Sequence, residues 1–249
     1  MSEKGDSGLQ AVLRDELIKR SDKVEDEYVT RVLSVIGNRE RLLDIGCGTG
    51  HIIRELGMRR ENVTLIGLDI SEPMIRIADE NTKGLSNVSL ILADGLRLPF
   101  GDSSFDIVIS RLADYSLSEI YRVLLEGGRF FEYGLGPRAD REIAEFFPER
   151  IERSNFFSPE NPESWTEEVS ERVARAGFTV NNLQEYESKE HYASEKEVAD
   201  LIEIVPLVKD FDRHRDSDVI HRLSMKYGDK QGIDITWHYY ILEAERLHI

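Results

Sequence analysis

Residues 42–50 read Leu-Leu-Asp-Ile-Gly-Cys-Gly-Thr-Gly, and this stretch decides the fold. It begins as a short apolar run, which predicts a buried strand, and then places three glycines within five positions. Glycine adopts backbone conformations that other residues avoid, and without a Cβ atom it lets a ligand approach the chain closely. Residues 51–58 continue with helical spacing, and we expect this helix to end at Gly57 or in the arginine-rich loop after it. The stretch therefore predicts a strand, a sharp turn and a helix whose N-terminus points at the turn.

Apolar runs and helical patterns alternate along the chain after this turn. Further apolar runs predict strands at 62–70, 87–94, 104–111 and 129–136. Ser71 is the expected cap of the helix after the first of these runs, and a second helix over 116–128 begins at Ser116 or Ser118 and stops at Gly127. The apolar runs do not alternate with polar residues, which is typical of strands covered on both faces. The pattern predicts an α/β fold with a doubly wound, mostly parallel sheet.

The two ends of the chain carry elements outside this alternation. Residues 9–36 predict one or two amphipathic helices. In the C-terminal half, we expect a helix over 165–177, a strand over 178–188 and a long, antiparallel final strand over 232–247. We interpret residues 1–36 as N-terminal helices and residues 37–249 as one domain. Two segments are interpreted as helical excursions that cover the substrate side: 135–164 and 190–229.

Composition limits the classes of function. The formal charge of −16 disfavours nucleic acid as a partner, although a local basic patch could still bind RNA and the acidity could serve solubility alone. No apolar run approaches the ~20 residues of a membrane span. The first ten residues lack the apolar core of a signal peptide, and the single Cys47 cannot form an internal disulfide, so we expect a cytoplasmic protein.

The glycine-rich turn fits two classes of cofactor. The dinucleotide fingerprint places its third glycine one residue later than Gly50, and here His51 takes that position. The turn is also preceded by Asp44, whose carboxylate is unfavourable beside a pyrophosphate but favourable beside a cation. S-adenosylmethionine (SAM) carries a sulfonium and an ammonium group. The acid therefore favours SAM over NAD.

Polar residues follow the next strands at the points where each of them ends. Asp69 ends the second run, where a carboxylate can accept hydrogen bonds from both ribose hydroxyls of an adenosine. Asp94 ends the third run, where its carboxylate can accept a hydrogen bond from the adenine amino group. The fourth run ends at Ser110 and Arg111. Open α/β sheets bind ligands at the carboxyl ends of their strands, so we expect these residues to share one site.

These motifs, in this order, resemble those of class I SAM-dependent methyltransferases. LLDIGCGTG, GLDISEPMIRIA, LADGLRLPF, FDIVIS and EIYRVLLEGGRF carry the resemblance over residues 40–134, with a weaker likeness in 165–186 and 233–247. The group that they resemble contains the ubiquinone- and menaquinone-biosynthesis methyltransferases (methyltransferase type 11). The resemblance implies a seven-stranded, Rossmann-like methyltransferase fold with a helical cap, with SAM as cofactor and S-adenosylhomocysteine as its product.

The resemblance also implies a role for each cofactor residue. Asp44 would orient the methionine amino group, Asp69 would hold the ribose, and Asp94 would bind the adenine amino group. Ile70 would pack on the adenine, while Ser110 and Arg111 would lie near the methionine moiety. The residues predicted to bind the cofactor are Asp44, Gly46, Cys47, Gly48, Thr49, Gly50, Asp69, Ile70, Met74, Asp94, Gly95, Ser110 and Arg111.

Plainer structural roles stand beside these assignments. Asp69 and Asp94 could each cap a loop or a turn. Cys47 is expected to be a small loop residue and not a nucleophile, because no histidine is placed by the sequence to activate it. Residues 237–240 (Trp-His-Tyr-Tyr) alternate between the faces of a strand, which favours core packing. His214 and His221 are not spaced as a metal pair, and we predict no metal site.

Methyl transfer from a sulfonium is an in-line displacement in which the protein mainly supplies proximity and alignment. A general base helps only if the acceptor must lose a proton. The candidates are Asp114, Tyr115, Tyr133, His191 and His238. In related sequences the fourth strand is followed by a longer stretch, but here only residues 111–115 precede the next helix pattern, so no catalytic residue of that stretch can be transferred.

The methyl acceptor is predicted to be a small organic molecule, because the chain is acidic and two phenylalanine pairs (146–147 and 156–157) suggest an enclosed apolar pocket. Two alternatives stay open: a methyltransferase that acts on protein, tRNA or rRNA, and a SAM-binding protein without methyl transfer. The sequence leaves the oligomeric state and the methylated atom open.

Overall fold

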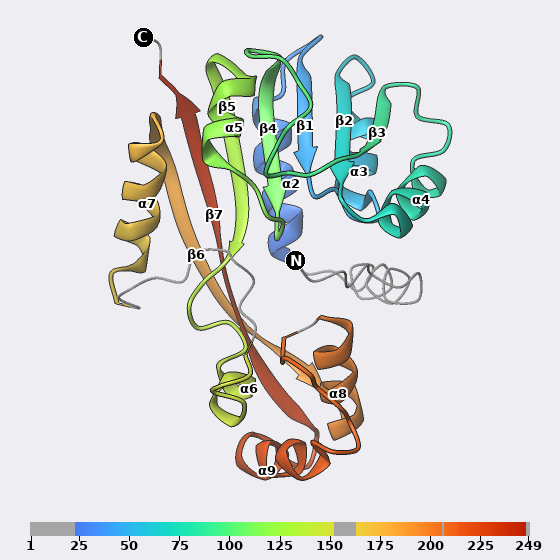
Figure 1. The fold of residues 1–249 in the computed structure, drawn as a ribbon, viewed down its shortest axis with the longest axis vertical. Helices are drawn as coiled ribbons and strands as arrows, with labels where there is room; N and C mark the ends of the chain where they lie inside the picture. Colours follow the sequence, from blue (N-terminus) through green and yellow to red (C-terminus); the bar gives the residue numbers. More distant parts are fainter. Residues whose placement is uncertain (1–22, 152–162, 206, 248–249) are drawn as a thin grey trace.

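The computed structural model describes residues 23–151, 163–205 and 207–247, which form a seven-stranded sheet in the order β3-β2-β1-β4-β5-β7-β6 (Figure 1). Strands β1 to β5 pair in parallel, and β7 runs antiparallel to both of its neighbours. The strands are β1 (Arg41–Ile45), β2 (Thr64–Asp69), β3 (Val88–Leu92), β4 (Phe105–Arg111), β5 (Leu124–Leu135), β6 (Phe178–Tyr192) and β7 (Ile233–Arg246). The predicted fold class is confirmed.

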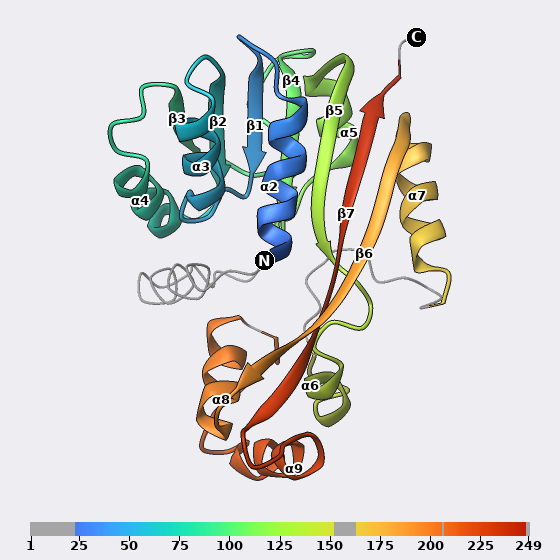
Figure 2. The ribbon, with the colours of Figure 1, turned by 180° about the vertical axis from the view of Figure 1, so that it is seen from behind.

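Helices cover both faces of this sheet, and further helices lie at the far end of β6 and β7. The helices of the described residues are α2 (Lys23–Val35), α3 (His51–Arg59), α4 (Glu72–Asn81), α5 (Leu117–Val123), α6 (Arg141–Phe146), α7 (Trp165–Arg175), α8 (Glu195–Ile204) and α9 (Ser217–Tyr227). Leu42 faces the core under α2 and α3, whereas its neighbour Leu43 faces the core under α5 and α7 (Figures 1 and 2). Since both faces are buried, the strands read as unbroken apolar runs. None of the helices within the described ranges is long and apolar enough to cross a membrane.

Of two predicted helix ends, that of α3 falls in the arginine-rich stretch after Gly57, which is one of the two expected positions, and that of α5 is wrong. Helix α3 continues past Gly57 to Arg59, and a Cβ atom on Gly57 would lie 2.9 Å from Cγ2 of Val88, so this glycine permits close packing on β3. Helix α5 ends at Val123 and not at Gly127, because Leu124 becomes extended and pairs with Phe105. The predicted cap at Ser71 is confirmed, since its Oγ accepts a hydrogen bond from the backbone N–H of Met74 (3.4 Å).

Ser116, and not Ser118, caps α5 by accepting a hydrogen bond from the backbone N–H of Glu119 (3.4 Å).

Of the predicted N-terminal helices, only residues 23–36 lie within the described part of the chain, and they contain α2. The second phenylalanine pair, 156–157, lies outside the described residues. The first pair belongs to α6 and its C-terminal end, where Phe147 is buried.

Strands β6 and β7 continue beyond the sheet as a long hairpin whose far end carries α6, α8 and α9 (Figures 1 and 2). We call these three helices and the hairpin end between Tyr192 and Ile235 the lobe. The lobe has its own apolar core, which includes Ile143, Leu223 and the ends of both strands. The prediction that an insertion starts at residue 190 is wrong by three residues, because β6 stays paired with β7 through Tyr192. The helical character predicted for the segment is confirmed.

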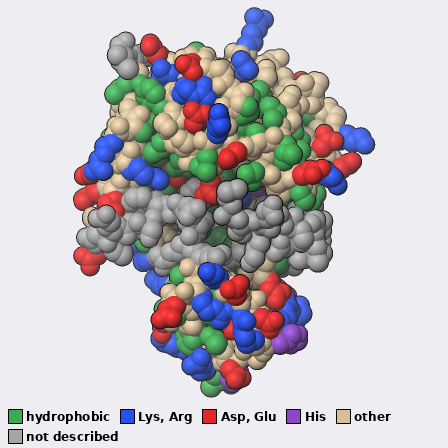
Figure 3. Space-filling model, viewed as in Figure 1, with side chains coloured by type: hydrophobic (Ala, Val, Ile, Leu, Met, Phe, Trp, Pro, Cys, Tyr) green, Lys and Arg blue, Asp and Glu red, His purple; other side chains and the backbone are tan. Residues whose placement is uncertain are grey.

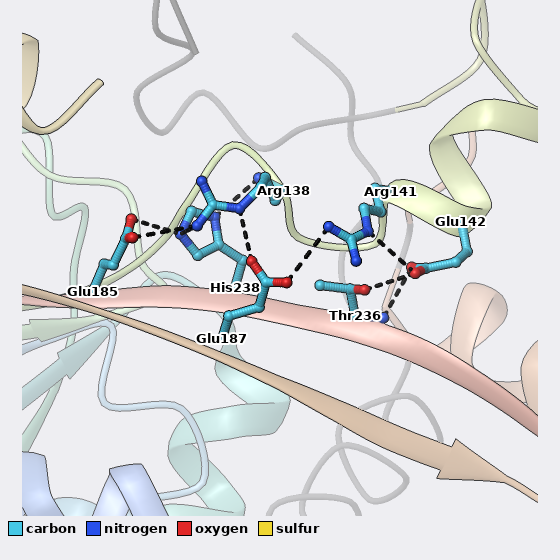
Figure 4. A network of polar contacts seen from close by, with 7 residues as sticks. All are labelled: Arg138, Arg141, Glu142, Glu185, Glu187, Thr236 and His238. Carbon is cyan, nitrogen blue, oxygen red and sulfur yellow. Dashed lines mark hydrogen bonds and ion pairs between the residues drawn. The ribbon is translucent and has the colours of Figure 1, made fainter. Parts of the chain in front are cut away.

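The segment after β5 lets β7 leave the sheet without losing hydrogen bonds. The backbone N–H of Gly136 donates to the carbonyl of His238 (2.8 Å), and that of Asp140 donates to the carbonyl of Thr236 (2.9 Å). The buried carboxylate of Glu142 then accepts from the backbone N–H (2.9 Å) and the hydroxyl (2.6 Å) of Thr236 (Figure 4). A buried carboxylate is costly unless it is bonded, so Glu142 fixes where the lobe begins.

A second junction is the ion pair between Arg150 and Asp216, which holds the end of α6 against the start of α9. Two nitrogens of Arg150 contact the two carboxylate oxygens of Asp216, each at 2.9 Å, and Asp216 is buried. The hydrogen bonds from Arg150 lower the pKa of Asp216 below its ordinary value. Bidentate pairs of this kind are the stronger class of ion pair.

We therefore expect Asp216→Asn to destabilise the protein by about 1.5–3 kcal/mol at pH 7, the usual contribution of a hydrogen bond to a charged group. Because the folded-state pKa is lowered, the wild-type contribution should be present above about pH 4 and be lost as the pH falls further. Urea unfolding, together with hydrogen exchange of the α9 amides, measures the change. Asp218→Asn, on the exposed first turn of the same helix, is the matched control. Equal stability of the two variants would contradict the role of the ion pair.

Candidate cofactor site

The turn after β1 has the backbone conformation that its glycines permit. Gly46 and Gly48 have φ angles of 70° and 54°, both in the left-handed region. The backbone N–H groups of Gly46 and Cys47 both donate to the carbonyl of Leu68 (2.8 and 2.9 Å), which fastens the turn to the end of β2. A Cβ atom on Gly46 would lie 2.0 Å from Cβ of Ala113, so the loop after β4 packs directly on this glycine. The turn is thus held by its two neighbouring strands.

Gly48 faces open space. A Cβ atom built on it would meet no atom within 4 Å. Its backbone N–H donates to Oδ2 of Asp69 (2.9 Å), and the other oxygen of that carboxylate accepts from the N–H of Ser71 (2.8 Å). Asp69 therefore has the loop-binding role that the sequence left open as its plainer alternative. A carboxylate has about four lone-pair sites, so these two bonds leave acceptor capacity for a ligand.

Asp44 is the most unusual side chain of the site. It is 3% exposed, and its Oδ2 has no hydrogen-bond partner among the described residues. Burial, and then the nearby charge of Asp69, raise the pKa of the Asp44 carboxyl to about 7, while Arg111 acts in the opposite direction. Proteins pair almost all of their buried polar atoms. An unpaired carboxyl oxygen beside an open turn therefore indicates a place for a polar ligand.

Two hydroxyls near Asp44 share this property. Oγ1 of Thr49 and Oγ of Ser110 are also buried and without a hydrogen-bond partner in the part of the chain that the structure describes. Thr49 belongs to the turn, and Ser110 lies on β4, which pairs directly with β1. The orphaned polar atoms thus lie on neighbouring elements at the carboxyl end of the sheet. These three oxygens can accept hydrogen bonds from a positively charged group such as the ammonium of the amino-acid end of SAM.

The predicted adenosine residues lie at the next strand ends. Ile70 is 73% exposed, so its side chain can cover an apolar ring, whereas Met74 lies on the buried face of α4. Oδ1 of Asp94 accepts from the backbone N–H of Leu96 (2.8 Å), so this acid does cap its turn. A Cβ atom on Gly95 would lie 2.4 Å from the backbone oxygen of Asp114, so the loops after β3 and β4 touch here.

Tyr28 is a site residue that the sequence did not reveal. It lies on α2, is fully buried, and its hydroxyl lies 3.2 Å from the carbonyl of Ser110 and 3.3 Å from that of Phe131. Arg111 lies over the ring of Tyr133, 5.4 Å from its centroid. The sequence predicted amphipathic helices over residues 9–36, but nothing in it indicated the position of the Tyr28 hydroxyl.

The candidate general bases do not lie together. Asp114 is exposed in the loop after β4, where partial burial and then Asp94 raise its pKa, and Tyr133 stacks on Tyr239 (5.2 Å) below Arg111. Tyr115 turns to the opposite face of the sheet and hydrogen-bonds to Arg172 (3.3 Å). Asp114 and Tyr133 are therefore the candidates nearest to the predicted cofactor site.

The two histidine candidates have other partners. His238 is fully buried at the base of the hairpin, where its Nδ1 accepts from the backbone N–H of Arg138 (3.0 Å) and its Nε2 lies 3.2 Å from Glu185 (Figure 4). Burial lowers its pKa. His191 lies toward the end of the hairpin and pairs with Asp234 (3.0 Å). Both histidines are thus engaged in contacts that hold the hairpin and its loops.

The thiol of Cys47 is not suited to act as a nucleophile. Burial raises the pKa of the Cys47 thiol well above its ordinary value, which keeps it protonated and a poor nucleophile. In residues 23–151, 163–205 and 207–247, no group of three or more His, Cys, Asp or Glu side chains is arranged to hold a metal ion.

Parts of this chain are similar to known methyltransferases. The model of a methyltransferase domain family matches residues 42–128. Over 99 residues the chain is 37% identical to demethylmenaquinone methyltransferase of Staphylococcus carnosus, an alignment that covers 35% of this chain and 40% of the relative. Over 113 residues it is 34% identical to malonyl-[acyl-carrier protein] O-methyltransferase of Methylococcus capsulatus, covering 42% of this chain and 41% of the relative.

The fold comparison extends over more of the chain. Phosphoethanolamine N-methyltransferase 2 of Haemonchus contortus, solved with phosphomonomethylethanolamine and S-adenosylhomocysteine, aligns with a TM-score of 0.55 at 19% identity, covering 91% of this chain and 53% of that one. This likeness concerns the fold. The chain spans about two fifths of the length of the curated relatives it matches. By its motif order and its fold, the chain resembles the class I SAM-dependent methyltransferases of the ubiquinone and menaquinone type, and its residues 42–128 match the model of a methyltransferase domain family.

Proposed function

We propose that this protein binds SAM in the turn between Gly46 and Gly50 and transfers its methyl group to a small organic acceptor. The observation that carries the proposal is the buried Oδ2 of Asp44, which has no hydrogen-bond partner among the described residues and lies beside the open space at Gly48. Asp44 would hold the methionine ammonium, Asp69 the ribose hydroxyls, and Asp94 the adenine amino group. When bound, SAM supplies a methyl group on a positively charged sulfur, which is already activated for displacement.

The protein's own part in the reaction is placement. The turn is fastened to the end of β2 by the bonds to Leu68 and Asp69, and the loop after β4 is packed on Gly46. Such fixed geometry supplies proximity and alignment. If the acceptor must lose a proton, Asp114 is the candidate that the site supports best, because it is exposed in the loop after β4 and because partial burial and then Asp94 raise its pKa.

The lobe supports an acceptor site that is enclosed on one side. The arrowheads of β1, β4 and β5 point toward it, so the lobe lies on the carboxyl side of the parallel strands (Figures 1 and 2). We propose that it forms a wall of the acceptor site. Acidic and basic side chains are interspersed on the face seen in Figure 3, and the chain carries a net charge of −16. Both features favour a small molecule over RNA or DNA.

Methyl transfer from isotopically labelled SAM tests this proposal. The acceptors to compare are a demethylmenaquinol-type hydroquinone, a malonyl thioester, bulk tRNA and a protein extract. We expect label in a small-molecule acceptor and none in RNA. Label in RNA or protein alone would support the macromolecular alternative. Binding of SAM with no transfer to any acceptor class would support a SAM-binding protein of another kind.

A further inference from the structure

The carboxyl of Asp44 has surroundings that favour its neutral form. It is buried at the centre of the sheet, at the end of β1, with one oxygen that no donor approaches among the described residues. The carboxylate of Asp69 lies close enough on β2 to disfavour a second negative charge. Asp69 is the better stabilised of the two carboxylates, because backbone N–H groups of Gly48 and Ser71 donate to its two oxygens.

The other groups around Asp44 do not offset the preference of its carboxyl for the neutral form. Tyr28 approaches from α2, and Cys47 lies in the turn. Burial raises the pKa of both groups well above its ordinary value, so both stay neutral near pH 7. Arg111 on β4 is the one group that favours an ionised Asp44 among those that act on it, and its guanidinium lies over the Tyr133 ring. Burial and Asp69 outweigh its effect.

We propose that Asp44 is protonated in the free protein in mildly acidic solution and that it releases its proton when a ligand ammonium group binds beside the Gly46–Gly50 turn, so that cofactor binding is there coupled to proton release. The inference rests on the proposed function, since it takes the amino-acid end of SAM or S-adenosylhomocysteine as the cation. The carboxyl O–H bond breaks, the proton leaves to solvent, and the resulting carboxylate is neutralised by the ammonium. No other bond changes.

The coupling fixes the direction of the pH dependence. The carboxyl of free Asp44 titrates at about pH 7, and a bound cation lowers that value. Above this pH the carboxylate is already formed, and affinity should be constant. Below it, each pH unit should weaken binding by about tenfold, because the proton must be removed first. Affinity is thus lost as the pH falls.

Calorimetry in buffers of different ionisation enthalpy measures the proton directly. Titration of the full chain with S-adenosylhomocysteine at pH 6 should release about one proton per bound ligand, and at pH 8 almost none. The matched probe is 5′-methylthioadenosine, which carries the same adenosine but no ammonium group. It should bind without proton release at either pH. Release of no proton with S-adenosylhomocysteine at pH 6 would overturn the inference.

Asp44→Asn supplies the matching variant. We expect its affinity for S-adenosylhomocysteine to be about 10- to 150-fold lower than that of the wild type at pH 8 and independent of pH between 6 and 8. Asp218→Asn, exposed on α9, should keep the wild-type affinity and pH dependence. If Asp44→Asn does not fold, the wild-type proton count still decides. Absence of any S-adenosylhomocysteine binding at pH 8 would refute the proposed function, whereas binding that stays pH-independent in the wild type would refute only the coupling.

Discussion

Asp69→Ala should weaken the binding of S-adenosylhomocysteine by about 10- to 150-fold, which corresponds to about 1.5–3 kcal/mol, the range for hydrogen bonds to a charged group. The loss has two sources. The variant removes the acceptor proposed for the ribose hydroxyls, and it frees the backbone N–H of Gly48 that Asp69 holds at 2.9 Å. Titration calorimetry at pH 8 measures the affinity, and urea unfolding measures how much stability the turn loses.

Asp79→Asn is the control for this prediction, because Asp79 is exposed on α4, the helix that follows Asp69. It should bind S-adenosylhomocysteine as the wild type does. A folded Asp69→Ala variant with unchanged affinity would show that another residue holds the ribose. The role of Asp69 would then be limited to fastening the turn.

Gly48→Ala should abolish most cofactor binding while the protein stays folded. The φ angle of Gly48 is 54°, and a Cβ atom there meets no protein atom within 4 Å. In the free protein the substitution should therefore cost about 1–2 kcal/mol, the usual penalty for a non-glycine residue in the left-handed region. With the cofactor bound, the methyl group would occupy the proposed ligand space, and we expect about a 5- to 150-fold loss of affinity, as overpacking typically costs about 1–3 kcal/mol.

Two glycines of the same chain serve as comparisons. Gly84 also has a positive φ, 90°, and open space around its Cβ position, but it lies between α4 and β3. Gly84→Ala should lose similar stability and keep full affinity. Gly46→Ala should lose more stability than either, because its Cβ would clash with Ala113 at 2.0 Å. Equal affinities of Gly48→Ala and Gly84→Ala for S-adenosylhomocysteine would contradict the proposed position of the cofactor.

The parallel core of the fold could be predicted because its signals are local. Each strand from β1 to β5 is an apolar run, and the glycine turn and the Ser71 cap mark where two helices begin. The errors arose where a distant partner decided the outcome. Helix α5 ends before Gly127 because Leu124 leaves the helix to pair with Phe105 on β4. No window of neighbouring residues contains that information.

The lobe shows the same limit on a larger scale. The helical patterns of α8 and α9 were visible in the sequence, but the length of the hairpin was not. The hairpin continues because β6 and β7 pair with each other to Tyr192 and Ile233, and because Glu142 bonds Thr236, 94 positions away in the chain. Whether the backbone N–H and C=O groups of β7 find hydrogen-bond partners beyond the end of β5 depends on such contacts, and these are visible only in the folded chain.

Within the candidate site, the sequence predicted positions better than chemical states. Asp44, Asp69 and Arg111 were expected at one edge of the sheet because they end neighbouring strands, and the strand order β2-β1-β4 places them there. That Asp44 has an unpaired oxygen and a pKa near 7 depends on how deeply it is buried and on what surrounds it. Tyr28 was missed because burial was its only sequence signal.

The most direct measurement of the central claim is a calorimetric titration of the chain at pH 8 with SAM, S-adenosylhomocysteine and NAD in turn. The site described here predicts binding of both adenosyl ligands in the micromolar range at one site per chain, with affinity lost in Asp44→Asn and Asp69→Ala and kept in Asp218→Asn. NAD should give no heat of binding. Binding of NAD with no binding of SAM or S-adenosylhomocysteine would contradict the account.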